Sequence, residues 1–107
     1  MDSTPRKTDY TNPGQQRVLA LLVLLAGNEF AGLTPAQCAA ALRTSQSNIT
    51  RDLDNLATAG LAERVGESSG WRLTPKLVQI GLAFTTHLDR TKAAAAEIEQ
   101  RYTRLPG

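Results

Sequence analysis

The stretch from Leu33 to Thr74, LTPAQCAAALRTSQSNITRDLDNLATAGLAERVGESSGWRLT, decides the fold of this chain. It opens with Thr34-Pro35-Ala36-Gln37, which has the T-x-x-Q form of a capping box with proline at the first helical position. This pattern predicts a helix start. We expect a short helix that ends near Arg43, a turn at Thr44-Ser45 with Ser45 as N-cap, and a second helix from Gln46 to Ala59.

A short hairpin is predicted directly after the second helix. Gly60 is a natural helix stop, and the short runs Leu61–Val65 and Trp71–Thr74 are joined by the turn-forming segment Gly66–Gly70. The order helix, turn, helix, hairpin predicts a winged helix-turn-helix. We expect Trp71 to anchor the hairpin on the helices, because buried aromatic residues dominate small cores.

Two further helices are expected around this stretch. Asn12-Pro13 looks like an N-cap followed by proline at the first helical position, so a first helix is predicted from Pro13 to Ala26. Its apolar residues form two stripes, so it requires two partners. The first stripe is Val18, Leu21, Leu22 and Leu25, and the second is Leu19, Val23 and Ala26.

The last helix begins at another threonine-proline pair, Thr74-Pro75, and runs to about Tyr102 or beyond. Apolar or small residues recur along it every seven positions, which indicates an imperfect heptad seam. The seam comprises Leu77, Phe84, Thr91, Ile98 and Leu105, with Ile80, Leu88 and Ala95 between them. Such a seam can pair with another subunit or pack on its own chain, and the sequence leaves both open.

The predicted fold class is therefore mainly α with a small β-hairpin (α+β), a winged helix-turn-helix with a long C-terminal helix. Residues 1–12 are expected to be a disordered arm because they are polar and lack periodicity. Residues 13–74 are predicted to form the winged helix-turn-helix DNA-binding domain, and residues 75–105 the C-terminal helix, which we expect to mediate dimerisation.

Composition narrows the possible functions. The chain has 107 residues, a net charge of +2 and a single histidine and cysteine, so it is mildly basic and lacks the ligands for a zinc cluster. No phosphate-binding loop or catalytic Ser–His–Asp set is present, so we expect no enzyme activity, cofactor, catalytic residue or metal site.

Cys38 is expected to be a buried core thiol. The apolar run Val18–Ala26 falls short of the ~20 residues of a membrane span, so a cytoplasmic protein without a membrane partner is expected.

The second helix of the unit carries the strongest functional signal. At 100° per residue, Ile49, Leu53 and Leu56 share one face and leave the opposite face polar. The N-terminal half of such a helix contacts base edges in helix-turn-helix proteins. Here that half offers amide, hydroxyl and guanidinium groups suited to bases, on Gln46, Ser47, Asn48, Thr50 and Arg51.

Two acidic residues favour an ordinary solvent-exposed face instead. Asp52 and Asp54 would both repel phosphate if they faced DNA. Asp52 is expected to project toward the flank of the helix, where it can pair with Arg51 or Arg64. Asp54 is harder to reconcile with a DNA interface.

The hairpin loop and the arm are the other candidate contacts. Polar and basic groups surround the loop, at Arg64, Ser68, Ser69 and Arg72, and would touch phosphate or the minor groove. Glu67 at the tip opposes this, and the arginines could simply keep an edge strand soluble. Arg6 and Lys7 of the arm could enter a minor groove or belong to a solvated tail.

Three segments resemble the N-terminal winged-helix domain of IclR-type bacterial transcriptional regulators, and MarR-type regulators more distantly. They are RVLALLVLLAG (17–27), the span 33–65 and GWRLTPKLVQIGLAF (70–84). The most telling motif is SxSxxxRxLxxLxxxGL, present as Ser45, Ser47, Arg51, Leu53, Leu56, Gly60 and Leu61.

The resemblance implies a homodimeric transcription regulator or repressor that binds double-stranded DNA at an operator. It implicates the same five residues of the recognition helix, and Arg72 is the best match in the wing. IclR-type proteins carry a large effector domain after the linker helix, whereas this sequence stops at Gly107. We therefore expect no small-molecule effector domain, as in a small phage-type or accessory regulator or a fragment of a longer protein.

A second function class stays open on the residues alone. The modest charge, the acidic residues near the predicted interface and the apolar seam all permit a winged-helix protein-protein interaction module. Salt dependence separates the two classes, because DNA binding releases counterions and an apolar helix seam does not.

Overall fold

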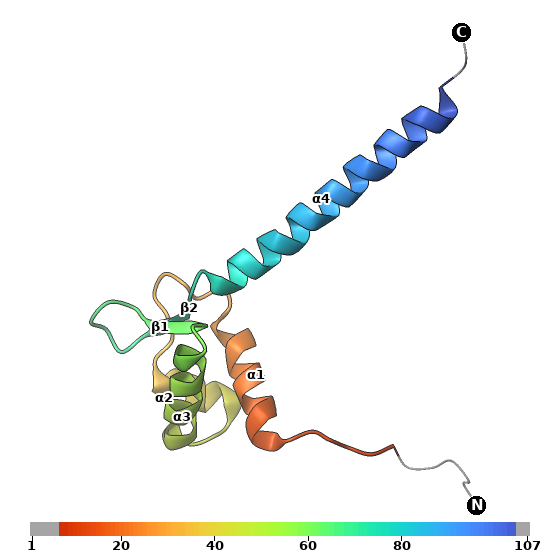
Figure 1. The fold of residues 1–107 in the computed structure, drawn as a ribbon. Helices are drawn as coiled ribbons and strands as arrows, with labels where there is room; N and C mark the ends of the chain where they lie inside the picture. Colours follow the sequence, from red (N-terminus) through yellow and green to blue (C-terminus); the bar gives the residue numbers. More distant parts are fainter. Residues whose placement is uncertain (1–6, 105–107) are drawn as a thin grey trace, which may run out of the picture. The chain divides into compact units, whose positions relative to one another are not determined.

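The computed structural model describes residues 7–104 (Figure 1). Its elements follow the predicted order: α1 (Pro13–Leu25), α2 (Pro35–Leu42), α3 (Gln46–Thr58), β1 (Ala62–Arg64), β2 (Trp71–Leu73) and α4 (Lys76–Thr103). The predicted fold class, mainly α with one hairpin, is confirmed. The chain divides into two compact units, one ending at Leu73 and the other beginning at Thr74. Arg6 of the arm and Leu105 of the seam lie outside the described residues.

The turn of the helix-turn-helix has the predicted caps on both sides. Thr34 Oγ1 accepts a hydrogen bond from the Gln37 amide at 3.2 Å, and Gln37 Oε1 accepts one from the Thr34 amide at 2.9 Å. These two bonds complete the capping box at the start of α2. At the start of α3, Ser45 Oγ accepts from the Asn48 amide at 3.2 Å. Both helix starts therefore lie where local sequence signals placed them.

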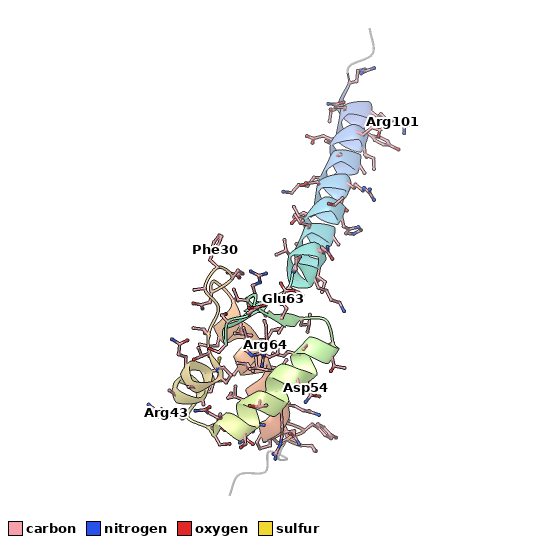
Figure 2. All side chains as sticks on the ribbon, turned by 90° about the vertical axis from the view of Figure 1, so that its left-hand side faces the viewer. Phe30, Arg43, Asp54, Glu63, Arg64 and Arg101 are labelled. Carbon is pink, nitrogen blue, oxygen red and sulfur yellow. The ribbon has the colours of Figure 1, made fainter. Side chains whose placement is uncertain are left out.

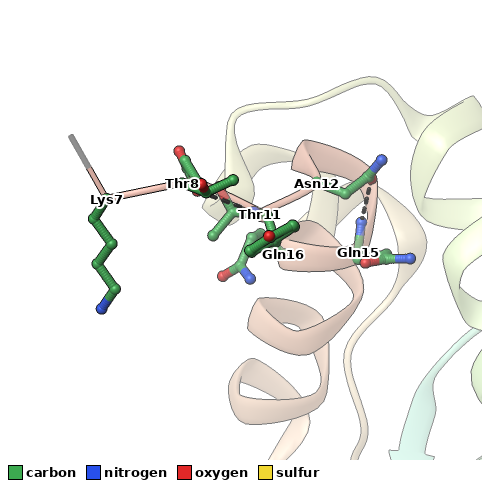
Figure 3. Close-up of a pocket in the computed structure, with 8 residues that line it drawn as sticks. Lys7, Thr8, Thr11, Asn12, Gln15 and Gln16 are labelled. Atoms are coloured by element: carbon green, nitrogen blue, oxygen red, sulfur yellow. Dashed lines mark hydrogen bonds between the residues drawn. The ribbon is translucent and has the colours of Figure 1, made fainter. Parts of the chain in front are cut away.

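The first helix is capped in the same way. Asn12 Oδ1 accepts from the Gln15 amide at 3.1 Å, and Pro13 occupies the first helical position (Figure 3). An open hollow lies beside this cap, bordered by residues 7–12 and by Gln15 and Gln16.

The core of the first unit lies among α1, α2, α3 and the hairpin. It consists of Leu21, Leu25, Cys38, Ala39, Ile49, Leu53, Leu56 and Ala62. Cys38 is fully buried, as predicted, and burial raises the pKa of its thiol. Trp71 is half-buried and packs against this cluster, which confirms its predicted anchoring role.

The hairpin is short and gains a third partner. β1 and β2 are antiparallel, with Glu63 opposite Arg72. Leu33, in the segment before α2, forms an isolated bridge with Trp71 through backbone hydrogen bonds of 2.9 and 2.8 Å. Gly32 permits this approach, because a Cβ at that position would lie 2.7 Å from the Trp71 carbonyl oxygen. The bridge was not predicted from the sequence, and it ties the hairpin to the chain entering α2.

Only one of the two stripes on α1 is covered by the first unit. Leu21 and Leu25 are fully buried, whereas Leu19 and Val23 are 55% and 73% exposed. The predicted division of this helix into a core stripe and a second apolar stripe is thus confirmed. No helix among residues 7–104 has the length and apolar character needed to cross a membrane.

Both strands are shorter than the predicted runs, at Ala62–Arg64 and Trp71–Leu73, and three helix boundaries differ from prediction. α1 and α3 each end one residue early, at Leu25 and Thr58, because the next residue is the C-cap. The expectation that Thr74 caps α4 was wrong. Pro75 itself is the N-cap with helical dihedral angles, so α4 begins at Lys76, and Thr74 Oγ1 accepts a long bond of 3.4 Å from the Lys76 amide.

Candidate nucleic-acid interface

The polar face of α3 is open to solvent, as predicted. Ile49, Leu53 and Leu56 bury the opposite face, so the helix cannot rotate without exposing apolar surface. Four of the five predicted contact residues of this helix are exposed: Gln46, Ser47, Thr50 and Arg51. Figure 2 looks onto this helix, with Asp54 labelled on it.

The fifth residue, Asn48, is half-buried because it braces the turn. Its Nδ2 donates to Thr44 Oγ1 at 2.9 Å. The Thr50 hydroxyl donates to the Gln46 carbonyl oxygen at 2.9 Å, which leaves its oxygen free to accept. Arg51, by contrast, has no carboxylate within ion-pair distance among the described residues.

Asp52 does not lie where it was predicted. It is only 3% exposed and forms a two-pronged ion pair with Arg17 of α1, with Nε–Oδ2 and Nη2–Oδ1 distances of 2.6 and 3.0 Å. The predicted pairing with Arg51 or Arg64 was therefore wrong. Asp52 comes three residues after Ile49, so it shares the inner face of α3, and it is tolerated there because Arg17 neutralises it.

This ion pair changes the charge of the outer face. The bond to Asp52 raises the pKa of the Arg17 guanidinium. One of the two carboxylates that counted against a DNA interface is thereby turned into the protein and compensated. Asp54 is the acidic residue that remains exposed on α3.

The predicted wing residues differ in what their side chains contact. Arg64 is exposed, and its guanidinium lies over the Trp71 ring, 5.6 Å from the ring centroid. This cation–π contact holds the arginine side chain against the Trp71 ring. Ser68 instead shapes the loop, because its hydroxyl donates to the Val65 carbonyl at 2.7 Å and accepts from the Gly70 amide at 3.2 Å. Ser69 is exposed at the loop.

Arg72 lies away from the loop tip, within β2. Its Nε is 3.0 Å from Glu63 Oε1 on the opposite strand, and its Nη1 donates to the Glu29 carbonyl at 3.5 Å. The charge of Arg72 is therefore compensated inside the first unit. Its predicted contact with DNA stays a prediction, as do those of the other site residues.

One basic residue near α3, Arg43, was not among the residues predicted from the sequence. Arg43 is the C-cap of α2 and adopts a left-handed conformation, with φ 54° and ψ 49°. It is exposed and lies beside the start of α3 (Figure 2). Its place just before the Thr44-Ser45 turn was visible in the sequence, but its backbone conformation was not.

Other kinds of site find no support in the described part of the chain. No group of three His, Cys, Asp or Glu side chains in residues 7–104 is arranged to hold a metal ion. Lys7 borders the hollow beside the α1 cap and is exposed (Figure 3).

Comparison with solved structures establishes the fold. An IclR family transcriptional regulator from Brucella abortus matches 89% of this chain with a TM-score of 0.65 at 17% identity. A Staphylococcus aureus MepR mutant bound to an oligodeoxyribonucleotide matches 76% with a TM-score of 0.53 at 22% identity. The Zalpha domain of Cyprinid Herpesvirus3 ORF112, described for its binding mode to Z-DNA, matches 56% with a TM-score of 0.51 at 20% identity.

These likenesses show that the chain has the winged-helix fold, and they confirm the predicted resemblance at that level. The chain spans 36% of the Brucella regulator and 62% of the MepR chain, but it spans 95% of the Zalpha domain. No protein-family model matches the sequence, and no relative is found among curated proteins.

Proposed function

We propose that this protein binds double-stranded DNA sequence-specifically as a winged-helix transcriptional regulator. The observation that carries the proposal is the inward turn of Asp52 onto Arg17. The exposed side of the N-terminal half of α3 then carries short polar groups and Arg51. Among the described residues, no carboxylate forms an ion pair with Arg51. The helix is held in place by its buried face, and a helix of this kind suits insertion into a major groove.

The mechanism divides the contacts by chemistry. Arg51 suits the O6 and N7 atoms of guanine, and Gln46 suits the N6 and N7 atoms of adenine. Ser47 and Thr50 suit bases or phosphates. Arg64 on the hairpin lies beside the duplex and contacts the backbone, which fixes the orientation of the protein on DNA.

The regulator is proposed to act as a homodimer. Leu19 and Val23 on α1 are exposed, and so are Phe84, Leu88 and Ile98 on α4. Burial of these apolar side chains against a second copy would remove them from water. A dimer would present two recognition helices to half-sites about 34 Å apart, and occupancy of such an operator would repress transcription.

The test is binding of the full chain to a random duplex pool by gel shift, at low and raised salt, followed by selection of retained sequences. The expected result is a shift that weakens steeply with salt and enriches a pseudo-palindromic site. The control variant is Arg90→Ala, which removes one exposed positive charge from α4 and should bind as the parent does. Absence of a shift at low salt would overturn the proposal.

The exposed apolar residues of α4 also favour a second candidate, a protein-protein interaction module. That module would show salt-insensitive association with a protein partner and no DNA shift. A Z-form duplex belongs in the same DNA panel, because the Zalpha neighbour shares the fold. A preference for that probe over B-form DNA would replace the proposed major-groove mode.

A further inference from the structure

Arg43 holds a backbone conformation that an arginine adopts at a cost. Among the residues that the structure describes, it is the one non-glycine residue with positive φ. In the left-handed region an L side chain crowds the following carbonyl oxygen, and glycine or asparagine normally takes such a helix-ending position. The backbone requirement is met without its side chain, because the Arg43 amide donates to the carbonyls of Ala39 and Ala40.

The side chain of Arg43 is not committed elsewhere in the described protein. It is exposed, and within residues 7–104 neither of the two ion pairs includes it. Arg17 and Arg72, by contrast, face carboxylates. Arg43 therefore exposes a full positive charge at a position where glycine would cause less backbone strain.

Arg43 lies where the protein would meet the DNA backbone at the edge of a major groove. It precedes the Ser45 cap of α3 by two residues, and the first amides of that helix carry the positive end of the helix dipole. If the start of α3 enters a major groove, the turn before it faces the phosphate backbone that borders the groove. A guanidinium there would meet a phosphate, which it binds through paired N–H groups.

We propose that Arg43 is a phosphate-binding residue of the DNA interface, which clamps the backbone beside the recognition helix. This inference rests on the proposed DNA-binding function. It assigns Arg43 to affinity and positioning, whereas Arg51 is assigned to base recognition.

The test uses three variants of the full chain, Arg43→Gly, Arg43→Asn and Arg43→Lys, with Arg90→Ala as the charge-matched control. Binding to the selected site and to random duplex is measured by fluorescence anisotropy at several salt concentrations, and thermal midpoints are measured in parallel. The glycine and asparagine variants should reduce the slope of log K against log salt by about 0.9 for each Arg43 removed. Their affinity should fall equally on both DNAs, so the specificity ratio stays unchanged.

The stability of Arg43→Gly should not fall together with its DNA affinity. The thermal midpoint of Arg43→Gly should hold or rise because the left-handed conformation no longer crowds a side chain, while its DNA affinity falls. Arg43→Lys should keep most of the salt slope, because it keeps the charge. A merely structural role for Arg43 would instead lower the midpoint of the glycine variant or leave the slope unchanged, and either result overturns the inference.

Failure of the inference is distinguishable from failure of the function. If the parent binds DNA and Arg51→Ala weakens it, while Arg43→Gly binds as the parent does, this inference alone falls. If the parent binds no duplex at any salt, the proposed function falls and this inference falls with it.

Discussion

The pairing of Arg17 with Asp52 is the residue-scale feature with the largest consequence for the surface. It holds the Asp52 carboxylate on the inner face of α3, so the outer face carries one negative charge fewer. Because Asp52 is almost fully buried and Arg17 is partly exposed, Asp52 depends on the pairing more than Arg17 does.

Arg17→Ala should destabilise the fold strongly. It leaves the Asp52 carboxylate buried without a partner, so the unfolding free energy should fall clearly further than in a variant of an exposed carboxylate. Urea denaturation followed by circular dichroism measures the change in unfolding free energy. Asp54→Ala, on the exposed face of the same helix, should stay within about 0.5 kcal/mol of the parent. Equal values for the two variants would mean that the ion pair does not hold α1 to α3.

Arg51→Ala should lose about 1–3 kcal/mol of binding free energy on the selected site and less on random duplex. The reason is that a bidentate contact to guanine distinguishes bases, whereas a phosphate contact does not. Competition titrations with the two DNAs measure the specificity ratio. An unchanged dissociation constant on the selected site would remove Arg51 from the base-recognition set.

At the scale of elements, the loop before α2 determines how the hairpin is attached. Gly32 lies in the left-handed region at φ 71° and approaches the Trp71 backbone closely, which allows Leu33 to bridge to Trp71. Gly27 also has positive φ, at 87°, but has open space around its Cβ position. The two glycines therefore separate the cost of the dihedral angle from the cost of the close contact.

Gly27→Ala should cost about 1 kcal/mol from its dihedral angle alone. Gly32→Ala should cost a further 1–3 kcal/mol, roughly, because its methyl group overlaps backbone atoms that cannot move without breaking the bridge. Thermal unfolding of both variants provides the comparison. If the two lose the same stability, the bridge between Leu33 and Trp71 contributes nothing to the fold.

At the scale of the whole molecule, the proposed assembly rests on α4. Exposed apolar residues on this helix include Phe84, Leu88, Ile98 and Tyr102, and spacings of four, ten and four residues place them along one seam. No residue of α4 is buried, and a row of exposed apolar side chains of this kind marks a surface that another molecule covers.

Phe84→Asp should convert the proposed dimer into a monomer, because a carboxylate in an apolar seam loses its hydration. Sedimentation velocity gives the oligomeric state, and gel shifts on full and half operators give the cost for DNA binding. Thr86→Asp adds the same charge at an exposed position outside the seam and serves as the control. A parent protein that sediments as a monomer at micromolar concentration would contradict the proposal.

Several features of this protein followed from local patterns in the chain. The capping box at Thr34, the Ser45 cap and the core residues of α3 lie where helix propensity, capping and periodicity placed them, because these signals act over three or four residues. The order of the elements, and hence the winged-helix class, is a property of the sequence by itself.

Tertiary packing decided the rest, since it depends on residues that lie far apart in the chain. Arg17 meets Asp52 across 35 positions, so the spacing from Ile49 indicates the inner face of α3, but no local pattern could identify the partner that neutralises Asp52 there. The Leu33–Trp71 bridge and the Glu63–Arg72 pair likewise arise only when separate segments are brought together. The sequence by itself determined which helices and strands form, whereas the tertiary structure decided which charges face outward, because burial and pairing are set by neighbours in space.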